Sequence, residues 1–389
     1  MSLKLGSTTI HQIHLATSST KIVPEGVFDI PSRSGTYDVK NYAFARASFE
    51  NNLDKRISGD FPSFYSNSTM STVGVYAFAG LDITEVSLPN VVSLNTGAFA
   101  YCSSLTSISL PALTNTGTGA FSECINLTEF NFPQCSSIGQ SAFMHTGLSY
   151  LDFSGVRIGR SAFNRCYSLQ AVILSQCTSI DYGAFQSCSN LSYVNLPSCT
   201  YISGYAFCSC WNLASISAPL CSYIGNDAFW ACYDLSEINF EECISAANYA
   251  FEYCSGASLV YMPKLTSVPY CGFSYCINLS DVYLPVCTSL GSNAFYGCSQ
   301  LEWLDLPNLN YIGSTCFANC RRLTGLSISS TTMVTLADIN AFNLTPMSSS
   351  TYMGYFGTIY VPDTLIDAYK SATNWIVYSD RFWVGSPPA

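Results

Sequence analysis

A phenylalanine recurs at intervals of 22 residues through the centre of this chain, and no other feature limits its possible folds so strongly. The strictest run extends from Phe163 to Phe317. Around each of these phenylalanines the same frame returns, A-F-x-x-C-x-x-L-x-x-V-x-L-P-x-C-x-x-I-G-x-x. A period of about 20–29 residues with L-x-x-L-x-L at its centre is typical of leucine-rich repeats, in which stacked coils bury one continuous core.

We therefore predict an α/β repeat fold, a leucine-rich repeat solenoid of about 12 coils with about 22 residues each. The A-F-x-x-C segment is expected to form a short helical turn on the convex side, with Phe and Cys pointing inward. The L-x-x-V-x-L segment is expected to add a strand to a concave parallel sheet. The proline that often follows ends the strand, and an Ile-Gly step turns the chain back.

The 19 cysteines follow the same period, which argues against a disulfide framework. Ten lie three residues after a repeat phenylalanine, and a second ladder lies eleven residues out of phase. Leu265 and Leu309 occupy empty positions of that second ladder, so we interpret both ladders as buried packing positions that hold thiols. No C-x-x-C pair has a partner pair at ligand spacing, so no metal site is predicted.

The sequences at both ends of the array suggest three parts. Residues 1–75 are predicted to be a β-rich arm or attachment module, with a small β-hairpin or β-arch before residue 28. Residues 76–342 form the solenoid, and residues 343–389 form a C-terminal cap. In this cap Asp363 is expected to begin a short helix whose inner face packs on the last coil, while Trp375 and Trp383 cover its open end.

Composition excludes several classes of function. The net charge is −10 and no basic run occurs, so nucleic acid is not an expected partner. Neither an apolar signal-peptide region nor an 18-residue apolar run is seen, so we expect no export signal and no membrane insertion. With three histidines and no nucleophile elbow, phosphate-binding loop or dinucleotide fingerprint, no catalytic residues, enzyme activity or cofactor are predicted.

The outward positions of the L-x-x-V-x-L strands vary from coil to coil while the frame stays constant. Variation on one exposed face of a regular scaffold is what a binding surface would have, and neutral drift on a solvated face gives the same appearance. Aromatic rings beside carboxylates can stack on sugars and accept their hydroxyl groups, or anchor a protein interface. The candidate binding residues are Tyr193, Glu237, Tyr261, Asp281, Tyr283, Glu302, Trp303 and Asp305.

The frame over residues 77–330 resembles the BspA-like leucine-rich repeat family, known from bacterial surface adhesins and protist surface proteins. The ending IYVPDTLIDAYKSATNW is similar to a cap common in that family. The first 50 residues or so, including MSLKLGSTTIHQIHLATSSTKI and SGTYDVKNYAFARAS, resemble short β modules of tailed-phage structural proteins. The first resemblance implies a surface-binding solenoid, and the second implies attachment to a phage particle.

These observations lead to a hypothesis with one alternative. The chain is predicted to be a non-enzymatic phage virion protein, such as a tail or head fibre, that binds a host-surface glycan or protein through its concave face. Its residues 1–75 would contact other virion proteins, and a homo-oligomer is possible. The alternative is a bacterial or protist adhesin or protein-interaction protein at the cell surface.

Overall fold

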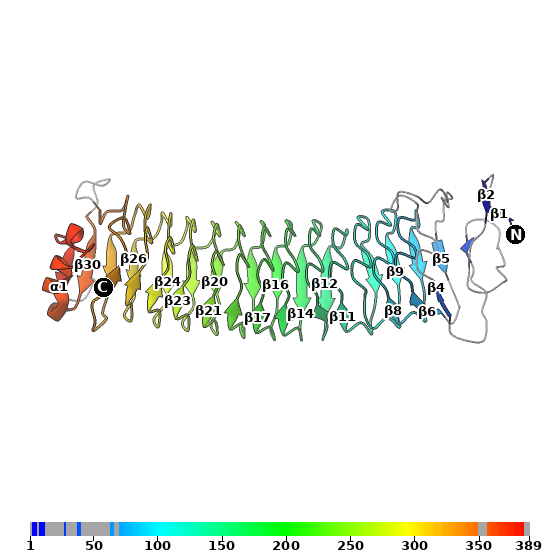
Figure 1. Ribbon diagram of the computed structural model, residues 1–389, viewed down its shortest axis with the longest axis horizontal. Coiled ribbons are helices and arrows are strands. Elements are labelled where there is room, and N and C mark those ends of the chain that lie inside the picture. The colour runs from blue at the N-terminus through cyan, green and yellow to red at the C-terminus, as the bar shows by residue number, and fades with distance from the viewer. Residues whose placement is uncertain are drawn as a thin grey trace. The chain divides into compact units, whose positions relative to one another are not determined.

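The structure, a computed structural model, describes the backbone of residues 2–5, 8–11, 27–28, 37–39, 63–65, 70–348 and 356–384, and side chains from residue 71 onward within these ranges. The chain divides into two compact units. Unit 1 contains residues Met1–Cys177 and Ala184–Ser189, and unit 2 contains Thr178–Gly183 and Asn190–Ala389. In both units the chain is a parallel β-solenoid with little helix, which confirms the predicted fold class (Figure 1).

Most coils contribute two short strands, which we call the first strand (from L-x-x-V-x-L) and the second strand (before the Ile-Gly step). In the coil after β9 the second strand is reduced to isolated bridges at Asn115. In unit 1 the first strands pair in parallel in the order β3, β5, β7, β9, β10, and β12 pairs with β14. The bounds of these strands are β3 Val27–Phe28, β5 Ser63–Tyr65, β7 Glu85–Ser87, β9 Ser107–Ser109, β10 Glu129–Asn131, β12 Tyr150–Phe153 and β14 Ala171–Leu174. The second strands are β4 Tyr37–Val39, β6 Met70–Val73, β8 Ser93–Leu94, β11 Ser137–Ile138 and β13 Arg157–Ile158.

Unit 2 continues the same arrangement within itself. Its first strands are β16 Tyr193–Asn195, β18 Ser215–Ser217, β20 Glu237–Asn239, β22 Leu259–Tyr261, β24 Asp281–Tyr283, β26 Trp303–Asp305, β28 Gly325–Ser327, β30 Thr358–Val361 and β31 Phe382–Val384. Its second strands are β15 Ser179–Ile180, β17 Tyr201–Ile202, β19 Tyr223–Ile224, β21 Ser245–Ala246, β23 Ser267–Val268, β25 Ser289–Leu290, β27 Tyr311–Ile312 and β29 Thr335–Leu336.

The core of each unit is built from the frame residues. In unit 2 the repeat phenylalanines from Phe207 to Phe342 stack in a column, with neighbouring ring centroids 5.3–5.7 Å apart. These rings are fully buried, as are most of the frame leucines. A 22-residue period therefore places one aromatic ring per coil at the same point of the cross-section, where offset stacking adds to the burial of apolar area.

The A-F-x-x-C segments are turns and not the short helices that the sequence suggested. The residues two before and two after the phenylalanine adopt positive φ, for example Asp227 (53°) and Ala231 (58°) around Phe229. This conformation interrupts an α-helix. It also directs alternate amides to the next coil, so that Phe229 N–H donates to the Ala250 carbonyl at 2.8 Å. The turns thus form a third ladder of hydrogen bonds between coils.

All 19 cysteines are buried, as the repeat predicted. In the first ladder the thiol of one coil donates to the phenylalanine carbonyl of the preceding coil, as Cys254 does to Phe229 at 3.3 Å. In the second ladder the thiol bonds locally, as Cys221 does to the Tyr223 carbonyl at 3.3 Å. The cysteines therefore combine a small apolar body with a weak donor for carbonyl groups inside the turns.

Parallel pairing starts earlier in the chain than the frame does. The strands β1 Ser2–Leu5 and β2 Thr8–His11 form an antiparallel pair, while β3 pairs with β5 and β4 with β6 in parallel. The described residues make about 14 turns, against the 12 or so expected. The other residues of the arm lie outside the described ranges, and its division from the solenoid at residue 75 stays a prediction.

One repeat in unit 1 is shorter than the others, because Phe143 and Phe163 are 20 residues apart. The strands beside it remain in register, with β11 paired to β13 and β12 to β14. The two missing residues are lost from the connections on either side of β12. The second strands and the phenylalanine column continue through this coil, whereas β10 and β12 belong to different sheets.

At the C-terminal end of unit 2, the helices η3 Asp363–Leu365, α1 Ile366–Ser371 and η4 Ile376–Tyr378 follow β30 (Figure 1). Tyr369 and Trp375 are buried, as expected, whereas Trp383 is 65% exposed and does not cover the end. Asp363 caps no helix, because the residue before η3 is Pro362 and no side-chain cap bond forms there. No helix among the described residues has the length and apolar character needed to span a bilayer.

Candidate binding surface

The first strands of unit 2 carry seven of the eight predicted binding residues, and the eighth, Glu302, directly precedes β26; we call the outward side of these strands the first-strand face. Tyr261 on β22 and Tyr283 on β24 are in register, and their rings stack with centroids 5.2 Å apart and planes 8° apart. Tyr283 is 50% exposed, while Tyr261 is half-buried. The two predicted tyrosines therefore form one rigid aromatic element and not two independent contacts.

Trp303 on β26 is directed toward the C-terminal coils. Its register partner is Gly325, and a Cβ atom there would lie 1.9 Å from Cε3 of the indole. With no side chain beneath it, the indole reaches Tyr360 on β30, at a ring-centroid distance of 5.4 Å. Gly325 is thus a positioning residue for Trp303, and Tyr360 is a member of this surface that the sequence analysis did not include.

We expect Gly325→Ala to destabilise the chain by about 1–3 kcal/mol, because the new methyl group overlaps the indole. Chemical denaturation of this variant, of Trp303→Ala and of the double variant measures the coupling. In the Trp303→Ala background the second substitution should cost less than about 0.5 kcal/mol, since the obstacle is gone. An equal cost in both backgrounds would mean that Gly325 is required for a reason other than the indole.

The predicted carboxylates differ in their ion-pair and hydrogen-bond partners. Glu302 forms an ion pair with Arg322, and Arg322 also donates to Gln300 at 2.7 Å. Asp281 accepts from the Ser280 hydroxyl at 2.6 Å. Asp305 is exposed on β26. These acceptors lie on the strands that carry Tyr283 and Trp303, or directly before them.

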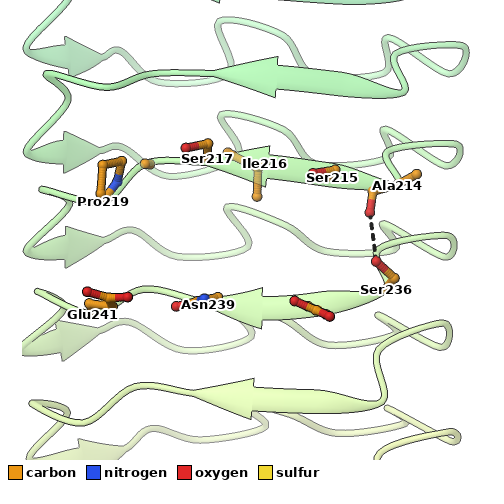
Figure 2. Close-up of a pocket in the computed structure, with 10 residues that line it drawn as sticks. Ala214, Ser215, Ile216, Ser217, Pro219, Ser236, Asn239 and Glu241 are labelled. Carbon is orange, nitrogen blue, oxygen red and sulfur yellow. Dashed lines mark hydrogen bonds between the residues drawn. The ribbon is translucent and has the colours of Figure 1, made fainter.

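Tyr193 and Glu237 stand apart from that cluster. Tyr193 is 41% exposed on β16, separated from Tyr261 by the strands β18 and β20. Glu237 is exposed on β20 and lines a groove of about 270 Å³ between β18 and β20. Figure 2 shows the lining side chains on these two neighbouring strands, with a hydrogen bond from Ser236 to the Ala214 carbonyl at one end. The lining residues are Ala214, Ser215, Ile216, Ser217, Ala218, Pro219, Ser236, Glu237, Asn239 and Glu241.

The groove coincides with a break in the sheet. β18 pairs with β16, and β20 pairs with β22, but within the described part of the chain no strand pairing joins β18 to β20. Ala218 occupies the frame position that Leu196 and Phe240 fill in the adjacent coils. Ile216 is half-buried, while Val194 and Ile238 in the adjacent coils are buried. Breaks of the same kind separate β10 from β12 and β24 from β26. A side chain as small as alanine at this frame position was a signal that could have located the groove.

A second cluster escaped the sequence analysis because it lies on the turns and not on the first strands. The half-buried Glu252 accepts a hydrogen bond from Trp230 Nε1 at 3.1 Å, and burial raises the pKa of its carboxyl group. Tyr253 stacks on Tyr275, with ring centroids 4.8 Å apart. These residues stand one and two positions after successive repeat phenylalanines, which is the pattern that would have revealed them. The Trp230 N–H and the Glu252 carboxylate are partners of each other within the cluster, which gives these two side chains a structural role.

Metal binding finds no support in the described residues, among which no group of three His, Cys, Asp or Glu side chains could hold an ion. The first-strand face therefore offers ring faces, carboxylate and amide acceptors, hydroxyl groups and one shallow groove. Such an arrangement is suited to recognition through ring stacking and hydrogen bonding.

The model of the BspA type Leucine rich repeat region (6 copies) matches residues 56–170, 156–280 and 244–360. The chain belongs to the BspA-type leucine-rich repeat family. BspA-type repeat proteins are binding and interaction proteins, and this membership confirms the resemblance found in the frame.

This BspA-type repeat protein is similar to solved structures of other leucine-rich repeat proteins. A leucine-rich repeat protein from Bacteroides ovatus ATCC 8483 is 24% identical, with a TM-score of 0.56 over 82% of this chain and 88% of that one. A leucine rich cell surface protein from Faecalibacterium prausnitzii A2-165 is 21% identical, with a TM-score of 0.42 over 85% and 95%. No curated protein matches the sequence. The likeness to the Bacteroides protein shows the solenoid fold.

Proposed function

We propose that the chain is a non-enzymatic interaction protein of the bacterial cell-surface type, which binds a surface glycan or protein through the first-strand face of unit 2. The observation that carries this proposal is the aromatic and acidic surface around the Tyr261–Tyr283 stack, displayed by strands whose inward residues follow the frame. Rigid tyrosine and tryptophan rings lose little side-chain entropy on binding and serve as anchors at interfaces.

Family membership favours the alternative of the sequence analysis over its main hypothesis. The BspA-type family is the one that the frame associates with surface adhesins, and it covers most of the chain. The phage role was based on the first 50 or so residues, most of which lie outside the described ranges. Attachment through residues 1–75 and formation of a homo-oligomer stay predictions.

Replacement of the ring anchors tests the surface. We expect Tyr283→Ala and Trp303→Ala each to weaken adhesion to target cells at least ~10-fold, because central aromatic anchors carry much of the binding energy of an interface. Tyr311→Ala is the matched control, since Tyr311 is 40% exposed but lies on the second strand β27. Adhesion that is unchanged in the first two variants, or lost equally in the control, would exclude the first-strand face as the binding surface.

A further inference from the structure

The groove between β18 and β20 has a chemistry that selects among ligands. Glu237 and Glu241 contribute carboxylates, Asn239 an amide, and Ser215 and Ser217 hydroxyl groups. No lining residue carries a positive charge. Strong acceptors of this kind favour a ligand with several hydroxyl donors, and the two carboxylates repel an anionic one.

An aromatic surface adjoins the groove on the side of β22. Asn239 is in register with Tyr261, and Tyr261 with Tyr283. Because Tyr261 uses one ring face to stack on Tyr283, its other face is turned toward β20 and the groove. Neighbouring strands lie about 4.8 Å apart, so a ligand in the groove would be close to this ring face.

The size of the groove sets the size of the ligand. Its volume of about 270 Å³ lies below the range of about 300–1,000 Å³ typical of pockets for drug-sized ligands. One pyranose ring fits such a space, with its hydroxyl groups directed to the acceptors and its apolar C–H face available to a tyrosine ring. The combination of acceptors, an aromatic face and limited volume is that of a site for a single sugar unit.

We propose that the groove between β18 and β20 binds one neutral hexose unit of a glycan, with Glu237 and Asn239 as hydrogen-bond partners and Tyr261 as the platform for the adjoining unit. This inference rests on the proposed function, because it assigns a ligand class to the same first-strand face. It adds a specificity, since glycans that present sialic acid or a uronic acid at this position are disfavoured.

Binding of small glycosides to the full chain tests this assignment. Methyl glycosides of glucose, galactose, mannose and N-acetylglucosamine, together with methyl glucuronide and sialyllactose, are titrated by saturation-transfer NMR and calorimetry. We expect at least one neutral glycoside to bind and the two acidic ones to bind at least ~10-fold more weakly. Glu237→Ala should weaken the neutral ligand ~10-fold or more, because it removes a charged acceptor. Ser217→Leu, which fills the groove, should abolish binding.

The matched control is Glu129→Ala. Glu129 has the same frame position on β10, a strand that pairs with its neighbour β9, and it is likewise exposed. Binding in this variant should equal that of the original chain. Absence of binding by every neutral glycoside, preference for an acidic one, or binding that survives Ser217→Leu would overturn the assignment. If periodate oxidation of the target-cell glycans leaves adhesion unchanged while Tyr283→Ala still weakens it, the ligand is a protein: the sugar site is then wrong, and the proposed function stands.

Discussion

Trp375→Ala is expected to lower the free energy of unfolding by about 3–5 kcal/mol, the range found when a buried aromatic side chain is truncated. The indole is 1% exposed and packs against Phe342, Tyr369 and Phe382. Its Nε1 donates to the Val334 carbonyl at 2.7 Å, so truncation also removes the partner of a buried acceptor. Guanidinium unfolding followed by circular dichroism measures the change.

Two further variants separate the contributions of Trp375. Trp383→Ala removes the same side chain from a position that is 65% exposed, and its effect should stay within about 0.5 kcal/mol. Trp375→Phe retains most of the packing but loses the N–H donor, which should cost about 1–3 kcal/mol. Similar losses in Trp375→Ala and Trp383→Ala would show that the end of unit 2 is covered differently.

Alkaline pH is expected to destabilise the chain through its buried cysteines. Burial raises the pKa of Cys221 and of Cys243 from an ordinary 9.0 to about 12. A thiol whose folded pKa is raised favours the folded state below pH 9, and that contribution is lost as pH rises from 9 toward 12. The two thiols together should cost about 5 kcal/mol of stability by pH 11, at about 1.4 kcal/mol for each pKa unit.

Chemical unfolding at pH values from 8 to 11, in the presence of a reductant, measures this dependence. The matched variant is Cys221→Leu/Cys243→Leu, since leucine occupies the same ladder at Leu265 and Leu309. Above pH 9 the free energy of unfolding of this variant should fall less steeply than that of the original chain. The difference should equal the contribution of the two replaced thiols. An identical slope in the original chain and the double variant would assign the alkaline effect to other groups.

The sequence predicted those features that one repeated residue type determines. The 22-residue spacing was sufficient for the phenylalanine column and the cysteine ladders, because each buried position recurs with the same side chain. It did not predict the turn conformation. The positions two before and two after the phenylalanine adopt positive φ with residues as different as Asp227, Tyr253 and Cys271. Only some coils have a glycine at these positions, which would have indicated positive φ.

The candidate surface was predictable in composition but not in its pairings. The frame correctly placed Tyr261 and Tyr283 on adjacent strands, and their register made them stack. The direction of the Trp303 indole depended on Gly325, whose effect requires knowledge of both strands. The groove is lined by one small residue, Ala218, between two larger ones in the adjacent coils, and a period alone does not reveal the space that such an exception leaves.

The short coil between Phe143 and Phe163 shows where the length of a repeat can change. The connections on both sides of β12 are shorter here, while β11 still pairs with β13, β12 with β14, and the phenylalanine rings remain stacked. These connections can therefore be shortened, or lengthened into display loops, without loss of the scaffold. The same positions are suitable for inserting a peptide tag or an epitope when the protein is used as an engineered carrier.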